Sequence, residues 1–551
     1  MNRSGRVLLW LAVLPACSGS DRAEVRPPPM GTLPEPMAAA PPASLVPPLV
    51  PEAAEVREAL GNGAYPVERL PAIVADVHPE SVHEGVLEVY ARSKGAWLWS
   101  DGPALSGAAG KLLQVLDAAE DVGLRASVIR SGRLRNLERA LGWNQSLLEL
   151  TGQGEARFLP LVRLRGLLLG ELDAQLTAAA LSVARALDRT DASGRALAGA
   201  LPAKGQLGAW VDGLLPRHPQ YVRLTKAMAR YRGYVARGAF TKLALPQGVP
   251  SIGKGGRGPL VTTLRTRLGE EGFASGPEGE DAETFDATLQ EDLRAFQYSR
   301  GLAASGLLDA ATAQALNVQP WELVARIERA LGEWRQSPAR DLTTFVEVNL
   351  PEFAVEVYRD GRRVGRHRAV IGYPFGTGGG RTKRYHAEVT EVVLNPGWTP
   401  SDGILEGELM PKEGEAPGFL EKKGFYWFTR PDGRRGVYQL PGRKNVLGRA
   451  VIRFPNENNI YLHGSPDLKQ FDGAVRAMSH GCVRVERIED LAADLLLADG
   501  SVDRSGFDQA MASGRTTTLV LKKPVPIHFE YVLVVVDDDD TVRFLPNVYR
   551  I

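Results

Sequence analysis

The chain has 551 residues and a formal net charge of +1. A charge this close to zero gives no electrostatic argument for a nucleic-acid partner, because proteins that bind DNA or RNA concentrate Lys and Arg on one surface. The hydrophobic fraction of 44% and the charged fraction of 24% are those of a globular protein. The length predicts three or four domains, and the chain has two cysteines, Cys17 and Cys482.

The N-terminus has the pattern of an export signal. Arg3 and Arg6 precede Val7–Ala16, an apolar run of ten residues that is too short to span a bilayer comfortably. The run ends at Cys17 and resembles a bacterial lipoprotein signal, although Pro15 is unusual at that place. The resemblance implies that residues 1–17 are a signal ending at a lipidated Cys17. It also implies a periplasmic protein anchored by lipid to the outer membrane of a Gram-negative-type envelope. The alternative is an ordinary secretory signal that contains a cysteine.

Residues 18–51 predict a tether. The segment 27–51 contains ten prolines and almost no charge. Such a composition favours extended polyproline conformations of about 3.1 Å per residue. The tether could therefore hold an enzyme some distance from a membrane, or it is a spacer with no special reach.

Residues 52–250 predict a helical scaffold domain, because apolar residues recur at helical spacing. The stripes that indicate helices are Val82/Val86/Val89/Tyr90, Leu112/Val115/Leu116/Ala119 and Tyr221/Leu224/Met228/Tyr231. The apolar stretch 158–187 is interrupted by charges, which favours a pair of core helices over a membrane span.

Residues 251–318 predict three short helices. The motif residues lie at Phe285-Asp286, Leu293, Phe296-Gln297, Gly301-Leu302, Gly306, Thr312 and Leu316-Asn317. This pattern resembles the three-helix peptidoglycan-binding domain of wall enzymes; the alternative is a plain three-helix bundle. A connecting helix is expected over 319–340.

From 341 onward the pattern changes to short strands rich in β-branched and aromatic residues. Strands are expected at 345–348, 353–358, 364–371, 387–394, 459–462, 516–522 and 531–536. The acidic run 537–540 predicts a solvated turn, with a metal site as the alternative. The predicted fold is therefore multidomain α+β: helical scaffold, three-helix unit and a mostly-β domain over 341–551.

The segment 463–485, HGSPDLKQFDGAVRAMSHGCVRV, has the residue types that thiol chemistry needs. A catalytic thiol requires a base and donors for a developing oxyanion. His463 follows a strand, and Gly481 permits a tight turn before Cys482. A Leu-rich helix is expected after Cys482, so the thiol is predicted near a helix start, where the thiolate is favoured.

The H-G and S-H-G-C-x-R motifs resemble the YkuD-type L,D-transpeptidase catalytic domain. Segments 441–448, 454–456, 459–463 and 524–531 are similar to the YcbB-like subgroup of that family. The resemblance implies that Cys482 attacks a diaminopimelate carbonyl of a peptidoglycan tetrapeptide stem and expels D-Ala. A second diaminopimelate amine would then take the acyl group and form a cross-link.

The same resemblance assigns roles to single residues. His463 would be the base, oriented by the Gly464 carbonyl, and backbone N–H groups near Gly481 and Cys482 would meet the oxyanion. The residues expected to shape the substrate pocket are Ser479, His480, Arg484, Tyr461 and Trp398. Residues of about 399–440 would form a lid.

Three other interpretations stay open. The enzyme could hydrolyse its acyl intermediate or attach a protein to the wall. It could instead be a non-catalytic peptidoglycan-binding lipoprotein, or His463, His480 and Cys482 could be zinc ligands. Neither a cofactor nor a metal is expected, and the expected partners are peptidoglycan stems and, through the lipid, a membrane.

Overall fold

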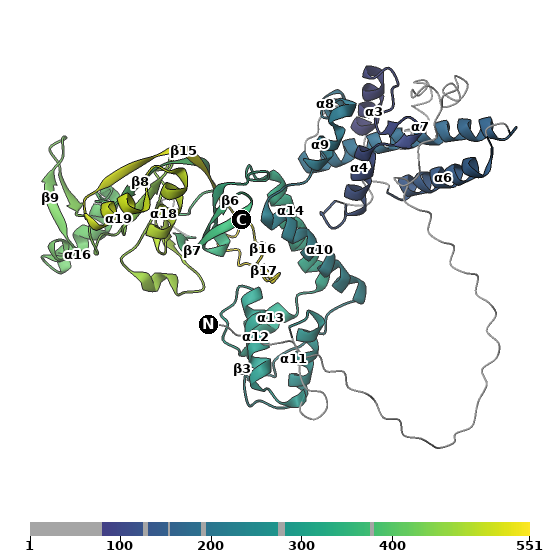
Figure 1. The fold of residues 1–551 in the computed structure, drawn as a ribbon. Helices are drawn as coiled ribbons and strands as arrows, with labels where there is room; N and C mark the ends of the chain where they lie inside the picture. The colour runs from purple at the N-terminus through teal and green to yellow at the C-terminus, as the bar shows by residue number, and fades with distance from the viewer. Residues whose placement is uncertain (1–79, 125–130, 153–154, 189–193, 274–281, 375–379) are drawn as a thin grey trace, which may run out of the picture.

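The computed structural model describes residues 80–124, 131–152, 155–188, 194–273, 282–374 and 380–551. The predicted signal, Cys17 and the tether lie outside these ranges. Figure 1 shows a helical body, a small helical unit and a β-domain that meet at two helices, α10 (Pro219–Arg237) and α14 (Pro320–Gln336). These two helices pack on each other. The predicted fold class, multidomain α+β, is confirmed.

The helical body is organised around one long helix, α7 (Phe158–Asp188). Around it lie α3 (Glu80–Arg92), α4 (Gly107–Asp117), α6 (Ser131–Leu150), α8 (Gly194–Gly199), α9 (Leu207–Asp212) and the small hairpin β1 (Ser100–Asp101)–β2 (Ala104–Leu105). The buried carboxylate of Asp173 on α7 accepts hydrogen bonds from the N–H groups of Leu98 (2.9 Å) and Trp99 (2.6 Å). This contact fixes the hairpin segment to the centre of α7.

The prediction of two helices over 158–187 was wrong, because α7 is continuous. Its glycines, Gly166 and Gly170, each weaken a helix by only about 1 kcal/mol, and its proline lies in the first turn, where no N–H partner is lost. Within the described ranges, α7 is the one helix long and apolar enough to cross a membrane. However, 83% of its most apolar window is buried inside the protein, as expected of a core helix.

The small helical unit contains α11 (Pro259–Glu270), α12 (Ala287–Ser299), α13 (Ala310–Leu316) and the two-residue strands β3 (Ser251–Ile252) and β4 (Leu308–Asp309). Asp286 and Asp309 cap α12 and α13 by accepting N–H hydrogen bonds at 2.8 Å each. Leu264, Leu293 and Phe296 are fully buried in its core. The buried Glu271 pairs with Arg267 and Arg300 and accepts a hydrogen bond from Tyr231 on α10, which ties the unit to α10.

The β-domain is a closed circuit of strands. The circuit runs β7–β14–β12–β11–β8–β15–β5–β6 and closes through the β6–β7 pairing, with β13 added beside β7. The strands are β5 (Phe345–Asn349), β6 (Ala354–Arg359), β7 (Arg362–Gly372), β8 (His386–Leu394), β11 (Ala450–Arg453), β12 (Leu462–His463), β13 (Ala477–Ser479), β14 (Val483–Val485) and β15 (Thr517–Glu530). Helices α18 (Ile488–Asp499) and α19 (Arg504–Ala512) follow β14. Closure removes the exposed sheet edge that an open sheet would present.

The predicted strand at 459–462 is only partly formed. Asn459 has φ +51°, and the Asn456 side chain accepts the N–H groups of Asn458 (3.1 Å) and Ile460 (2.9 Å). An asparagine that binds nearby backbone N–H groups stabilises a turn. The strand therefore begins at Leu462.

The segment predicted as a lid forms a separate small layer at the end of the β-domain farthest from the helical body (Figure 1). It contains α15 (Asp402–Ile404), a π-helical turn (Leu405–Leu409), α16 (Met410–Glu415), α17 (Phe419–Lys422) and the hairpin β9 (Phe425–Thr429)–β10 (Arg435–Gln439). Its own core consists of Leu405, Leu420, Phe425 and Val437.

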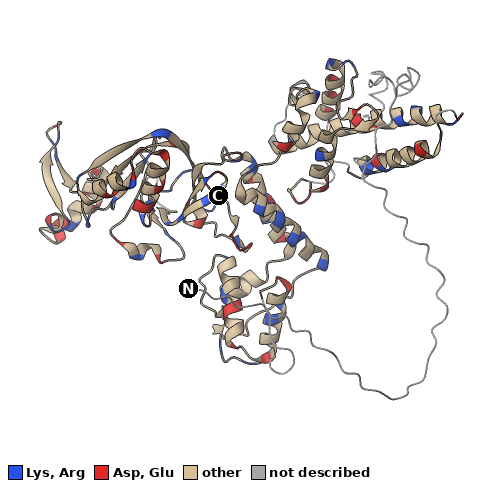
Figure 2. Ribbon diagram, viewed as in Figure 1, with Lys and Arg blue, Asp and Glu red and all other residues tan. Residues whose placement is uncertain are grey.

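The C-terminal hairpin, β16 (Val534–Val536) and β17 (Val542–Phe544), packs against α10 and α14. Its buried residues belong to the same apolar cluster as those of the helical body. Its turn holds the acidic run that the sequence predicts to be solvated. Asp538, Asp539 and Asp540 are exposed, as predicted. Asp538 also pairs with Arg223 on α10 and Arg363 on β7, and Asp537 lies 2.8 Å from Arg543. Figure 2 shows basic residues, coloured blue on the ribbon, along α10 and α14. The acidic turn therefore joins the helices to the β-domain.

Candidate active site

Two short parallel strands place four chemically important side chains on one face of the sheet. β12 pairs with β14 so that Leu462 lies opposite Val483 and His463 lies opposite Arg484. Leu462 and Val483 are fully buried in the barrel core. Because side chains alternate along strands, the opposite face carries Tyr461, His463, Cys482 and Arg484. The register thus brings the predicted nucleophile and base together.

His463 is held as a neutral imidazole. It is buried, and its Nδ1–H donates to the Gly464 carbonyl at 2.7 Å. Burial and then the positive charge of Arg484 lower the pKa of His463 to about 3. With the proton on Nδ1, Nε2 is left with a lone pair and can accept a proton.

A glycine is needed at position 464 because the backbone at Gly448 passes close to it. A Cβ at Gly464 would lie 2.7 Å from Ile488 Cγ2 and 3.1 Å from the Gly448 Cα. A larger residue would push the two segments apart and move the carbonyl that orients His463.

Cys482 is protonated at rest. Its side chain is half-buried, and the thiol contacts the Asn459 carbonyl at 3.9 Å. Burial raises the pKa of Cys482. The prediction that Cys482 lies near a helix start was wrong: it directly precedes β14, and α18 begins only at Ile488, after Arg487 with φ +50°. The dipole of α18 therefore does not favour the thiolate, and the thiol needs a nearby base to ionise.

The loop before Cys482 is fixed by hydrogen bonds. Ser479 Oγ donates to the Cys482 carbonyl at 2.5 Å and accepts the Gly481 N–H at 3.2 Å. Gly481 has φ +124°, and its carbonyl accepts from Thr382 Oγ1 at 2.7 Å. The Gly481 N–H, expected to meet an oxyanion, is thus engaged with Ser479 in the resting protein.

The remaining predicted site residues lie around this centre. His480 is exposed, and its Nε2 lies 2.6 Å from Glu408 of the lid segment. Arg484 donates to Gln470 Oε1 at 2.7 Å. Trp398 and Tyr461 pack on the same small cluster of Val393, Leu447 and Val451. Burial and then the Cys482 sulfur raise the pKa of Tyr461 to about 12.

The structure does not group the three residues of the zinc alternative. In the parts of the chain that are described, the potential metal donors that gather are instead those of His386, His528 and Glu530. Both Glu530 oxygens already accept hydrogen bonds, from Ser337 at 2.5 Å and from Arg384 at 2.9 Å. We therefore read this group as an ion-pair network between the barrel and α14.

Comparison with known families decides the identity of the domains. The L,D-transpeptidase catalytic domain family, YkuD, matches residues 343–523. The peptidoglycan-binding domain family matches residues 257–316, and a scaffold domain family matches residues 84–228. The chain contains a YkuD L,D-transpeptidase catalytic domain. The small helical unit is its peptidoglycan-binding domain.

The chain is similar to three proteins that are named as L,D-transpeptidases. A Haemophilus influenzae protein with the provisional name L,D-transpeptidase is 26% identical over 224 residues, which are 38% of this chain and 45% of that protein. The chain thus spans less than half the length of this relative. A Xylanimonas cellulosilytica L,D-transpeptidase structure is 18% identical, with a TM-score of 0.18, and covers 52% of this chain and 100% of its own. A Mycobacterium smegmatis L,D-transpeptidase is 13% identical, with a TM-score of 0.18. That match covers 34% of this chain and 59% of the other.

Some residues of the YkuD domain site had no sequence signal. Thr382, Glu408 and Gln470 each contact a predicted site residue. Glu408 lies in the predicted lid and Gln470 within the segment 463–485, but no pattern singles either residue out there. Thr382 follows the Gly-rich segment 375–381, most of which lies outside the described residues. Only the folded chain assigns these three contacts.

Proposed function

We propose that the protein is a cysteine L,D-transpeptidase that links meso-diaminopimelate residues of neighbouring peptidoglycan stems. The observation that carries the proposal is the shared face of β12 and β14, with neutral His463 beside the protonated Cys482. The peptidoglycan-binding domain supports peptidoglycan as the partner. A wall-binding lipoprotein without activity would have no use for this arrangement.

In the first half-reaction His463 Nε2 takes the thiol proton, and the sulfur attacks the diaminopimelate carbonyl that carries the terminal D-Ala. A thioester forms as the C–N bond breaks, and the departing amine of D-Ala takes the proton from His463. In the second half-reaction the side-chain amine of another diaminopimelate attacks the thioester and releases Cys482. His463 moves the proton again from the attacking amine to the sulfur.

The surrounding residues would hold the substrate for these steps. Arg484 shares the face with Cys482 and carries a positive charge suited to a stem carboxylate. The lid segment reaches the site through Glu408 and His480. We propose that the lid covers the thioester and limits its loss to water.

Mass spectrometry of peptidoglycan incubated with the protein or with Cys482→Ala tests the reaction. We expect dimers joined between two diaminopimelates and one D-Ala released per thioester, with neither product from the variant. Intact-protein mass without an acceptor should show a tripeptide adduct on Cys482. D-Ala release without dimers would favour a hydrolase or a protein-attaching enzyme, and no D-Ala release would contradict the proposal.

We also propose that Cys17 carries lipid and anchors the protein to the outer membrane on its periplasmic side. The support is the sequence pattern of residues 1–17 alone. Cells fed an alkyne fatty acid should label the protein, and the Cys17→Ser variant should stay unlabelled and leave the membrane fraction. Equal labelling of both proteins would reject the anchor.

A further inference from the structure

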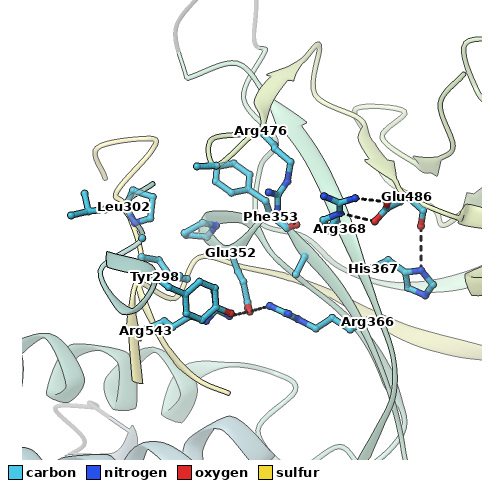
Figure 3. A pocket seen from close by; sticks show the side chains of 16 residues that line it. Tyr298, Leu302, Glu352, Phe353, Arg366, His367, Arg368, Arg476, Glu486 and Arg543 are labelled. Atoms are coloured by element: carbon cyan, nitrogen blue, oxygen red, sulfur yellow. Dashed lines mark hydrogen bonds and ion pairs between the residues drawn. The ribbon is translucent and has the colours of Figure 1, made fainter. Parts of the chain in front are cut away.

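A cavity of about 380 Å³ lies where three parts of the chain meet, away from Cys482. Tyr298 and Leu302 come from the peptidoglycan-binding domain, Phe353 and Arg476 from the catalytic domain, and Arg543 from the C-terminal hairpin. Figure 3 shows these side chains around one space, with Tyr298 and Leu302 at one side and Arg476 and Arg368 at another. The volume is within the range of small-ligand pockets.

Three of the four arginines in this cavity already have acidic partners. Arg366 lies 2.6 Å from Glu352, which also pairs with Arg543. Arg368 donates to both oxygens of Glu486, at 2.8 and 2.7 Å. These pairs, drawn in Figure 3, leave little unbalanced charge on that side of the cavity.

Arg476 differs from the other three. Its guanidinium donates to the backbone carbonyls of Phe353 (3.0 Å), Ala369 (3.0 Å) and Gly473 (2.8 Å), and among the described residues it pairs with no carboxylate. Burial, then Arg368 and Arg366, lower the pKa of Arg476 to about 10. Carbonyl groups fix its direction without neutralising its charge, so the cavity keeps a net positive charge suited to an anion.

The other surfaces of the cavity are apolar. Phe353 is 3% exposed, and the Arg476 guanidinium lies 5.2 Å from the centre of its ring. Leu302, Leu545 and Pro546 complete this lining. The ligand should therefore combine a carboxylate with an apolar body, as a short peptide does.

The cavity is also close to the catalytic loop. Arg476 directly precedes β13, which leads to Ser479 and Cys482, and Glu486 directly follows β14. A ligand on Arg476 would therefore touch the segment that leads to the nucleophile.

We propose that this cavity binds a carboxylate of a peptidoglycan stem peptide that the peptidoglycan-binding domain presents to the catalytic domain. The ligand class rests on the proposed function, whereas the site rests on the cavity and its unpaired arginine. The bound stem would belong to the strand that the binding domain holds, separate from the stem that acylates Cys482.

The test uses the full chain carrying Cys482→Ala, so that the protein does not react with the probe. Two variants at one residue at the edge of the cavity are compared in that background. Ala474 is exposed and lines the cavity. Ala474→Glu adds a carboxylate beside Arg476, and Ala474→Gln is its neutral match in size. These variants leave the three backbone hydrogen bonds of Arg476 in place, which Arg476→Gln would remove.

The probe is a disaccharide tetrapeptide, and the readout is the methyl NMR signals of Leu302 and Leu545. We expect saturable shifts of both signals, with at least about tenfold weaker binding in Ala474→Glu than in Ala474→Gln, the effect of one charge-assisted hydrogen bond. A derivative with carboxamides in place of its carboxylates should not saturate. Equal affinity in the two variants, or unmoved signals, would overturn the proposal.

Two further measurements separate a carboxylate site from a phosphate site, and the cavity site from the proposed reaction. Inorganic phosphate that saturates the shifts where the muropeptide does not would reassign the cavity to phosphate and overturn the carboxylate proposal. D-Ala release is measured separately with Cys482 intact. Release without methyl shifts would overturn the cavity site alone, whereas shifts without release would leave the cavity site and reject the proposed reaction.

Discussion

Two buried histidines, His463 in the active site and His218 at the start of α10, have nearly the same electrostatic state. Burial lowers the pKa of each to about 3, so both rings are neutral at physiological pH. By depth and pKa alone, either could be taken for a catalytic base.

Their hydrogen bonds distinguish them. His218 Nδ1 accepts the Gln220 N–H at 3.2 Å, its Nε2 lies 2.8 Å from Glu347, and its ring stacks on Trp334 at 3.9 Å. These contacts of His218 join α10 and α14 to strand β5. His463 donates Nδ1–H to Gly464 and also interacts with the Val446 backbone, and its ring lies on the face of the sheet that carries Cys482. A place on the same face as a nucleophile, more than a shifted pKa, identifies the reactive histidine.

The largest effect is expected from His463→Gln. Glutamine can keep a hydrogen bond to Gly464 but cannot accept the thiol proton, so D-Ala release should fall by about 10²–10⁴-fold. The melting temperature should change little in comparison. A variant that retains more than a tenth of the rate would show that another group ionises Cys482.

His218→Ala should lower the stability and leave D-Ala release nearly unchanged, the reverse of His463→Gln. It leaves a cavity beside Trp334 and takes a partner from the buried Glu347, which should cost about 3 kcal/mol of unfolding free energy. Chemical denaturation measures that loss, and D-Ala release per folded molecule should stay within about twofold of the parent. A lost rate with intact stability would place His218 in the reaction and remove the contrast with His463.

The pH dependence of stability sharpens the comparison further. The unfolded pKa of a histidine is about 6.5, and the pKa of folded His218 is about 3. Between these two pKa values the unfolded chain binds a proton at His218 that the folded chain does not bind. The contribution of neutral His218 to the free energy of unfolding is therefore complete above pH 6.5 and is lost as the pH decreases. The slope is about 1.4 kcal/mol per pH unit for one such group.

His218→Gln removes this share of the pH dependence. The stability difference between parent and variant should therefore narrow by about 2 kcal/mol from pH 7 to pH 5. His463 and Glu347, whose buried carboxyl has a raised pKa, are present in both proteins. A constant difference across this range would mean that His218 is already charged in the folded protein.

The fold class was predicted correctly because strand and helix patterns are local, and the pair of His463 and Cys482 stays a prediction from an equally local motif. Strand alternation and the S-H-G-C run can each be recognised within a few residues. The sequence predicted two helices over 158–187 because charged residues interrupt the apolar stretch. These residues lie within the one continuous helix α7. The thiol environment was misjudged because β14 and Arg487 separate Cys482 from α18.

Contacts between distant segments could not be predicted. Thr382 lies 99 positions from Gly481, and Arg476 lies 123 positions from Phe353. Such partners are brought together only when the barrel closes, and neither residue belongs to a periodic pattern. The role of His218 likewise has no local signal, because its partner Glu347 is 129 residues away.

The smallest effect concerns the third histidine, His480, which is paired rather than buried. Its Nε2 lies 2.6 Å from Glu408, with side chains 50% and 41% exposed. Exposed pairs of this kind contribute about 0–1 kcal/mol, so Glu408→Gln should lower the kcat/KM of D-Ala release by no more than about fivefold. The loss should disappear in 1 M salt, where screening acts within about 3 Å. Glu406→Gln, on the same lid turn, is the matched control and should have no effect. A loss above tenfold that persists in salt would show that His480 does more than hold the lid, and His463 would no longer be the one histidine assigned to act on Cys482.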